Sequence, residues 1–146
     1  MPNRILKESI CRSPNLGRLS WQSEVLFYRL LVQADDFGCF DGRAAIIRGL
    51  CFPLRLDDVS DTDIVSWVNE LERAGLLRVY EVGGEPFLTF LNWEAHQRVR
   101  NQHRKYPVPP ERQLSLAASN SLSNDSPPTR GELDSDSDWI REGAGG

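Results

Sequence analysis

The sequence predicts an α+β domain that contains three helices and a β-hairpin and is followed by a disordered acidic tail. Apolar residues recur at helical spacing in three segments before residue 76. Two shorter segments with strand character flank a Gly-Gly pair at residues 83–84, and Pro, Ser and Asn dominate from residue 107 onward. The 146 residues therefore divide into a domain at 1–107 and a tail at 108–146.

The first helix is expected over residues 20–34, with Ser20 as its N-cap. Its sequence VLFYRLLV at residues 25–32 is apolar over most of the helix circumference, which predicts a central place in the core. The turn DDFG at residues 35–38 follows, and it ends in a glycine that can adopt the left-handed conformation.

A very short extended segment, Cys39 and Phe40, comes after this turn. The second helix is expected over residues 43–51, with Asp41 as its N-cap. It ends before Pro53, because proline disfavours a helical conformation in the residue that precedes it.

The third helix is the most completely specified element. The sequence SDTD at residues 60–63 has the form of a capping box, with Asp63 in the place of the usual Glu or Gln. Apolar residues at helical spacing run from Ile64 to Leu71 and predict one buried stripe. Gly75 supplies the C-terminal stop.

Two strands are expected at residues 77–82 and 86–91, joined by the tight turn at residues 83–84. The order of elements is therefore helix, short strand, helix, helix and hairpin. This order is typical of a winged helix-turn-helix, in which the hairpin is the wing and residues 39–40 pair with it as a third strand.

The third helix is the element that would read DNA in such a fold, so its exposed face is the first candidate site. At 100° per residue, the side chains opposite the buried stripe can donate to base edges and phosphates. They are Thr62, Ser66, Asn69 and Arg73. A polar face is also what any solvated helix presents, and Asp63 and Glu70 beside this one would repel phosphate.

The tip of the hairpin is a second and weaker candidate. Backbone amides of a Gly-Gly turn can approach a phosphate, but Glu81 and Glu85 flank the turn and Arg78 is the nearest cation.

The third candidate is the basic segment at residues 98–106, RVRNQHRKY, which follows the hairpin. Its cations are Arg98, Arg100, Arg104 and Lys105. We expect phosphate contacts here, the alternative being a solvated charge run that leads into a linker. Arg4, Lys7 and Arg12 join this surface if the N-terminal segment packs beside the wing.

The formal net charge of −4 does not contradict DNA binding once it is divided along the chain. Residues 1–112 carry 15 basic and 15 acidic side chains, whereas residues 113–146 carry two arginines against six acids. Local clusters rather than the total charge determine attraction to phosphates, because salt screens charges more than about 8 to 10 Å apart.

Neither catalysis nor a cofactor is predicted, because the sequence contains no nucleophile with an adjacent base and no phosphate-binding glycine loop. Asp35 and Asp36 suit a turn better than a metal site. The three cysteines are too widely spaced for zinc and are expected in the core, and His96 and His103 are expected in solvent or near phosphate. The apolar runs are too short to cross a membrane, which predicts a cytoplasmic protein.

Several segments together resemble the N-terminal domain of phage replisome organisers, the DnaD-like replication initiation proteins. The resemblance covers about residues 1–107. It rests on MPNRILKESIC at residues 1–11, EVLFYRL at 24–30, DDFGCFD at 35–41, FPL at 52–54, WEAHQ at 93–97 and KYP at 105–107.

The resemblance implies a winged helix that binds origin DNA or other replication proteins and assists loading of the replicative helicase. Such proteins often carry a second helical domain, and the tail at 108–146 departs from that pattern. The alternatives are a transcriptional regulator of the same fold and a protein–protein adaptor that binds no DNA. The sequence leaves the oligomeric state open.

Overall fold

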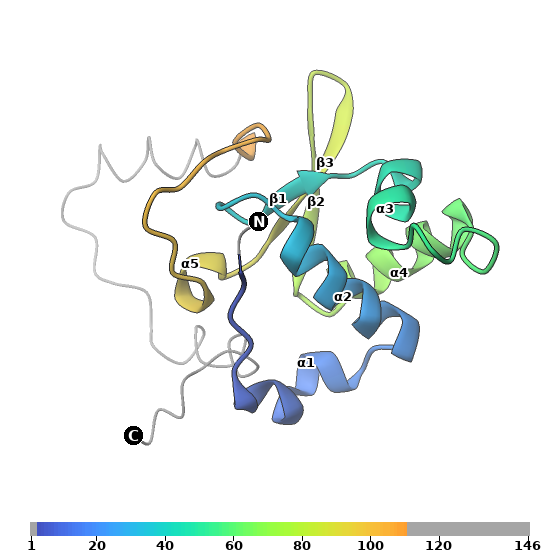
Figure 1. The fold of residues 1–146 in the computed structure, drawn as a ribbon, viewed down its shortest axis with the longest axis horizontal. Coiled ribbons are helices and arrows are strands. Elements are labelled where there is room, and N and C mark those ends of the chain that lie inside the picture. Colours follow the sequence, from blue (N-terminus) through green and yellow to red (C-terminus); the bar gives the residue numbers. More distant parts are fainter. Residues whose placement is uncertain (1–2, 111–146) are drawn as a thin grey trace.

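A computed structural model describes residues 3–110 of the chain, so the tail predicted to be disordered lies, apart from its first residues, outside the described part. Within it the elements follow the order 3₁₀-helix η1 (Glu8–Arg12), α1 (Pro14–Gly17), α2 (Trp21–Gln33), β1 (Cys39–Asp41), α3 (Ala44–Cys51), α4 (Asp61–Arg73), β2 (Leu77–Val82), β3 (Glu85–Phe90) and α5 (Trp93–His96). The predicted α+β class is confirmed (Figure 1).

Two of the three main helices begin where the sequence predicts, because their N-caps are hydroxyl side chains. The Ser20 Oγ accepts a hydrogen bond from the backbone N–H of Ser23 at the start of α2. At the start of α4, Ser60 and Asp63 form both bonds of the capping box. The start of α3 differs, since its N-cap is Arg43, and Asp41 ends β1 while accepting from the Arg43 N–H at 2.8 Å.

The three strands form one antiparallel sheet in the order β1-β3-β2. Leu88 of β3 lies opposite Phe40 of β1 on one side and Val79 of β2 on the other. The predicted third strand is therefore confirmed. The hairpin turn has Gly83 and Gly84 at φ values of 62° and 81°, a conformation that favours glycine at both positions.

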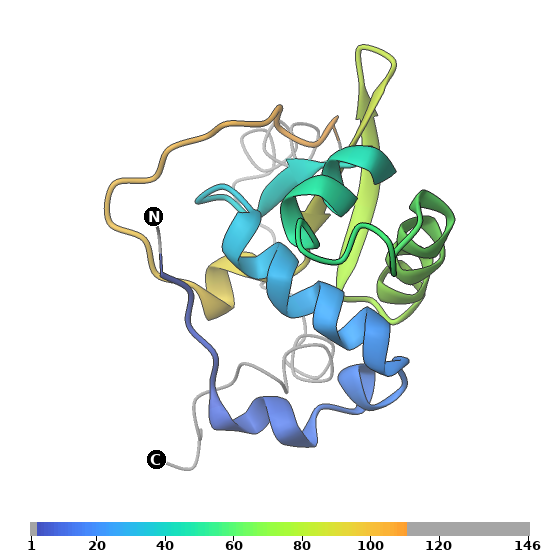
Figure 2. The same ribbon diagram turned by 45° about the vertical axis from the view of Figure 1, so that its right-hand side comes forward.

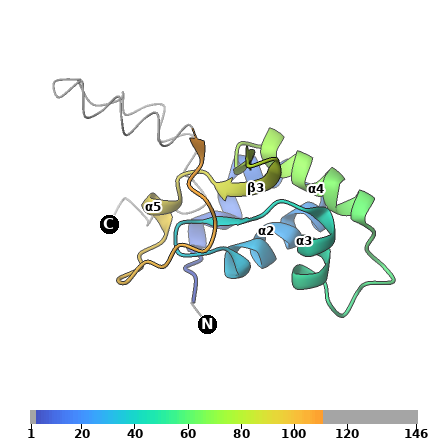
Figure 3. The same ribbon diagram turned by 90° about the horizontal axis from the view of Figure 1, so that it is seen from above.

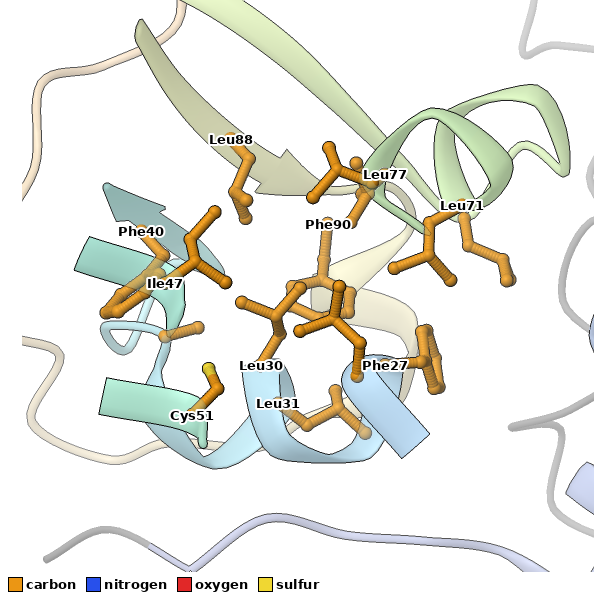
Figure 4. Packing of buried hydrophobic residues seen from close by; sticks show 14 of the residues in the cluster. Phe27, Leu30, Leu31, Phe40, Ile47, Cys51, Leu71, Leu77, Leu88 and Phe90 are labelled. Carbon is orange, nitrogen blue, oxygen red and sulfur yellow. The ribbon is translucent and has the colours of Figure 1, made fainter. Parts of the chain in front are cut away.

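One core joins the helices to one face of the sheet (Figure 4). The side chains of α2 occupy its centre, as the sequence predicts, and those of α3, α4 and all three strands surround them. The labelled members of this cluster are Phe27, Leu30, Leu31, Phe40, Ile47, Cys51, Leu71, Leu77, Leu88 and Phe90. Not all of the apolar circumference of α2 is used, since Trp21 is 82% exposed and Val32 52%.

Three short helical elements, η1, α1 and α5, were not predicted from the sequence. Each has at most five residues, which is too short for an apolar period to be recognised. They flank the predicted elements, and the segment after α5 turns back along the domain in Figures 1 and 2.

Asp35 attaches this returning segment to the end of α2. Its Oδ1 accepts hydrogen bonds from the backbone N–H groups of Phe37 at 2.9 Å and Cys39 at 3.0 Å, which closes the local turn. Its Oδ2 accepts from the backbone N–H groups of Lys105 at 3.0 Å and Tyr106 at 3.3 Å. The turn role expected for Asp35 is therefore accompanied by a long-range one.

Asp36 attaches both ends of the domain. Its Oδ2 accepts from the backbone N–H of His103 at 2.9 Å, and its Oδ1 lies 3.4 Å from the Arg4 guanidinium. Arg4 also donates to the carbonyl of Ala34 at 2.8 Å and lies 5.0 Å from the ring centroid of Trp93. A cation at this position satisfies carbonyls that the end of α2 leaves without helical partners.

We predict that Asp35→Asn lowers the free energy of unfolding by about 2 to 4 kcal/mol, because bonds to a charged acceptor contribute about 1.5 to 3 kcal/mol each and an amide would present N–H groups to N–H groups. Urea denaturation measures this difference. Asp57→Asn, at an exposed loop position, is the matched control and should change stability little. Equal stability of the two variants would contradict the assignment.

Candidate nucleic-acid interface

The face of α4 opposite the core is exposed along its length. Thr62, Ser66, Asn69 and Arg73 are all exposed, as the helical projection predicts. Ile64, Val68 and Leu71 of the predicted stripe are buried, whereas Trp67 is half-buried. The Arg73 Nε donates to the Asn69 carbonyl at a long 3.4 Å, and this bond does not engage the terminal guanidinium nitrogens. Whether this face contacts DNA remains a prediction.

Three acidic side chains of α4 have structural partners. Asp63 accepts from the Ser60 N–H in the capping box, and Glu72 accepts from the backbone N–H of Val79 at 2.9 Å. The Glu70 carboxylate accepts from the backbone and hydroxyl of Ser20, both at 3.0 Å. A bond from the Ser23 hydroxyl, together with these two, lowers the pKa of Glu70 below its ordinary value. These bonds fix the positions of the two carboxylates but leave their negative charges in place, so the repulsion expected from Asp63 and Glu70 remains.

Arg18 is a cation of this face that no sequence pattern indicates. It is exposed and, with Arg73 and Ala74, lines a small hollow beside the end of α4. The packing of the segment before α2 against Glu70 brings Arg18 there. No spacing rule relates residues 18 and 73, so the sequence carried no signal for this pair.

The hairpin contributes less positive charge. Its far end projects beyond the helices in Figures 1 and 2, and Glu81 and Glu85 stay exposed near the turn. Arg78 is half-buried on β2, opposite Thr89 of β3. We therefore keep the interpretation of this tip as mainly a structural turn.

The basic segment presents three exposed cations, Arg98, Arg100 and Lys105. Arg104 lies 4.1 Å from the ring centroid of Phe37 and donates to the Tyr106 carbonyl at 3.4 Å, so it is partly used in holding the segment. The backbone bonds to Asp35 and Asp36 fix this segment against the domain. It is therefore not the mere start of a linker.

The N-terminal segment packs beside Gln97 and the end of α2 rather than along the hairpin that the prediction for Arg4, Lys7 and Arg12 named. Arg12 is exposed and is paired with Glu8 on η1. The side-chain amide of Gln97 bonds the N–H and the carbonyl of Ile5 at 2.9 Å and 3.0 Å. Arg4 itself is buried, with 2% of its side chain exposed, so it serves the fold and leaves the candidate surface. Lys7 is half-buried at the start of η1.

The two basic surfaces are separate. In Figures 1, 2 and 3, α4 lies on one side of the molecule and the segment after α5 on the other. The α4 face comprises Thr62, Ser66, Asn69, Arg73 and Arg18, and the strap surface comprises Arg98, Arg100 and Lys105.

The histidine and cysteine predictions need two corrections. His96 is buried in α5, where burial lowers its pKa to about 3, whereas His103 is exposed as expected. Cys39 and Cys51 are buried as expected, but Cys11 is exposed because η1 lies at the surface. Residues 3–110 contain no cluster of three potential metal ligands among His, Cys, Asp and Glu.

No helix within residues 3–110 is long and apolar enough to span a membrane. Comparisons of the chain with protein-family models, with curated proteins and with solved structures give no match.

The pKa of Asp36 predicts how stability depends on pH. The backbone N–H of His103, followed by Arg4, lowers this pKa below its ordinary value of 3.8. A lowered pKa contributes stability that is present above 3.8 and is lost as pH falls through the lower folded value.

We therefore expect Asp36→Asn to destabilise the protein at neutral pH and to approach the wild type in stability as the pH falls below 3.8 through the lower folded value of the Asp36 pKa. Urea denaturation across this pH range measures the difference. A destabilisation that is constant with pH would show that the charge of Asp36 is not involved. Asp57→Asn again serves as the control.

Proposed function

We propose that residues 3–110 form a winged helix-turn-helix DNA-binding domain, with α4 as the recognition helix and the β2–β3 hairpin as the wing. Support comes from the element order, the sheet order β1-β3-β2 and the contact of α3 with α4. The observation that carries the proposal is the exposed line of hydrogen-bonding side chains on α4, Thr62, Ser66, Asn69 and Arg73, opposite its buried face.

We further propose that the protein acts in replication initiation as a phage-type replisome organiser that binds origin DNA and assists helicase loading. The sequence segments named above support this assignment, and several of them meet in space. The turn at residues 35–38 contacts Arg4, Trp93 and the segment before Pro107. These segments contact one another in the folded domain, which is a physical reason for them to occur together in one sequence.

The two exposed surfaces suit different contacts with DNA. Side chains of the α4 face can hydrogen-bond base edges and so discriminate sequence. The strap surface carries three exposed cations, so it suits phosphates of another DNA segment or of a bent duplex, and the exposed amides of Asn101 and Gln102 among them can add hydrogen bonds. A domain with these two surfaces can hold two stretches of DNA, as an initiator must when it organises an origin.

The α4 face is tested with Asn69→Ala combined with Arg73→Ala, in the full-length protein. We expect about a tenfold loss of affinity for the preferred duplex and little loss for an unrelated duplex, because base contacts discriminate by about 1 to 3 kcal/mol each. Fluorescence anisotropy with labelled duplexes from the gene and its flanks measures both. Arg12→Ala, an exposed arginine paired with Glu8 on η1, is the control.

The strap surface is tested separately with Arg100→Ala combined with Lys105→Ala. We expect weaker binding to all sequences alike, and a salt dependence whose slope falls by about one unit for each phosphate that the variant no longer binds. If neither double variant changes the affinity for DNA, the proposal that these two surfaces bind DNA is contradicted. Absence of binding by the wild-type protein to any duplex would favour the adaptor alternative.

A further inference from the structure

A groove beside α4 has no part in the proposed contacts with DNA. It has a volume of about 590 Å³ and lies between the start of α2, the segment after α3 and the first half of α4. Its apolar lining consists of Trp21, Val25, Phe52, Val59 and Trp67. The rings of Phe52 and Trp67 pack at 5.8 Å and form one wall.

Part of this apolar lining is open to solvent. Trp21 is 82% exposed and Val25 40%, and Leu54 beside the groove is 96% exposed, whereas Phe52 and Val59 are buried beneath them. Large apolar side chains that gather around a hollow are typical of sites that bind another segment of protein.

Positive charge lies at one end of the groove. A second hollow adjoins it, lined by Arg29, Pro53, Leu54 and Arg55, and the two arginines line both hollows. Arg29 is held in place by a 2.8 Å bond to the Cys51 carbonyl. The acidic residues at the groove lie in the larger hollow only.

The two aspartates that line the larger hollow differ in how firmly they are already bonded within the fold. Asp63 is engaged in the capping box, and Asp58 lies 3.7 Å from Arg55 in an exposed pair. An exposed pair of this kind contributes little, so an acidic ligand can replace Asp58 as the partner of Arg55. The site therefore suits a ligand that carries an aromatic or aliphatic anchor directly next to acidic residues.

The chain itself contains such a segment, ELDSDSDWIR at residues 132–141. Its Trp139 and Ile140 directly follow three aspartates at alternate positions, which would share one face in an extended conformation. A random chain as long as the 29 residues from Pro110 to Trp139 has an end-to-end distance of about 30 Å, enough to reach across a domain of this size.

We propose that residues 132–141 dock into this groove of their own chain, with Trp139 and Ile140 in the aromatic hollow. The aspartates before them then lie over Arg29 and Arg55. Docking covers Trp21 and Leu54 and places acidic residues beside the start of α4, next to the face proposed to contact DNA.

Fluorine NMR of the full-length protein labelled with 5-fluorotryptophan tests the proposal, because two of the four tryptophans line the groove. Replacing Trp139 and Ile140 together by alanine should shift the signals of Trp21 and Trp67. The signal of Trp93, which is buried beside α5, should stay in place. Leu114→Ala with Leu116→Ala, at tail positions without adjacent acids, is the matched control and should change none of them.

The reciprocal variant is Trp21→Ala, which removes an exposed side chain and should leave the fold intact while shifting the signal of Trp139. Arg55→Ala and high salt should each shift the signals of Trp21 and Trp67 in the same direction as the replacement of Trp139 and Ile140 does. Signals of Trp21 and Trp67 that do not respond to the tail variant would overturn the proposal. A response that disappears on dilution would also overturn it, since a second copy would then be the occupant.

Discussion

The carboxylates of Asp35 and Asp36 join the two ends of the domain to the end of α2, and much of the arrangement depends on these bonds. Four backbone N–H groups converge on Asp35, two from its own turn and two from residues 105 and 106. The Asp36 carboxylate accepts a hydrogen bond from the backbone N–H of His103 and forms an ion pair with the buried Arg4. Carboxylates are strong acceptors, and bonds between segments that are remote in sequence restrict the chain more than local turn bonds do.

This constraint decides where the positive charge lies. The strap, residues 97–110, is bonded to the α2–β1 turn, on the other side of the molecule from α4 in Figure 3. The acids of α4 are engaged in a different way, since Glu70 binds the start of α2 and Glu72 binds β2. The fold thus separates a surface with exposed cations from a face with exposed hydrogen-bonding side chains. A net negative chain can present both, because screening makes local charge decisive.

The sequence predicted the elements whose signals are local. The caps of α2 and α4, the turn at Gly83 and the stripe from Ile64 follow from residues within one or two turns, and all are found. It could not predict that Arg4 is buried, that Arg18 lies near Arg73 or that the strap folds back, because these follow from contacts between distant segments. The apolar circumference of α2 predicted burial on nearly all sides, but Trp21 is exposed and lines a groove. The spacing and composition of apolar residues do not distinguish a face packed in the core from one that lines an exposed groove.

Amide hydrogen exchange at Lys105 and Tyr106 in the full-length protein tests most directly whether the carboxylate pair unites the domain. Both N–H groups are bonded to Asp35, whereas Arg100 and Asn101 in the same strap are exposed. We expect strong protection at residues 105 and 106 and rapid exchange at residues 100 and 101. Exchange at all four positions at the rate of an exposed chain would contradict this role of Asp35, and the separation of the two basic surfaces would then have no structural basis.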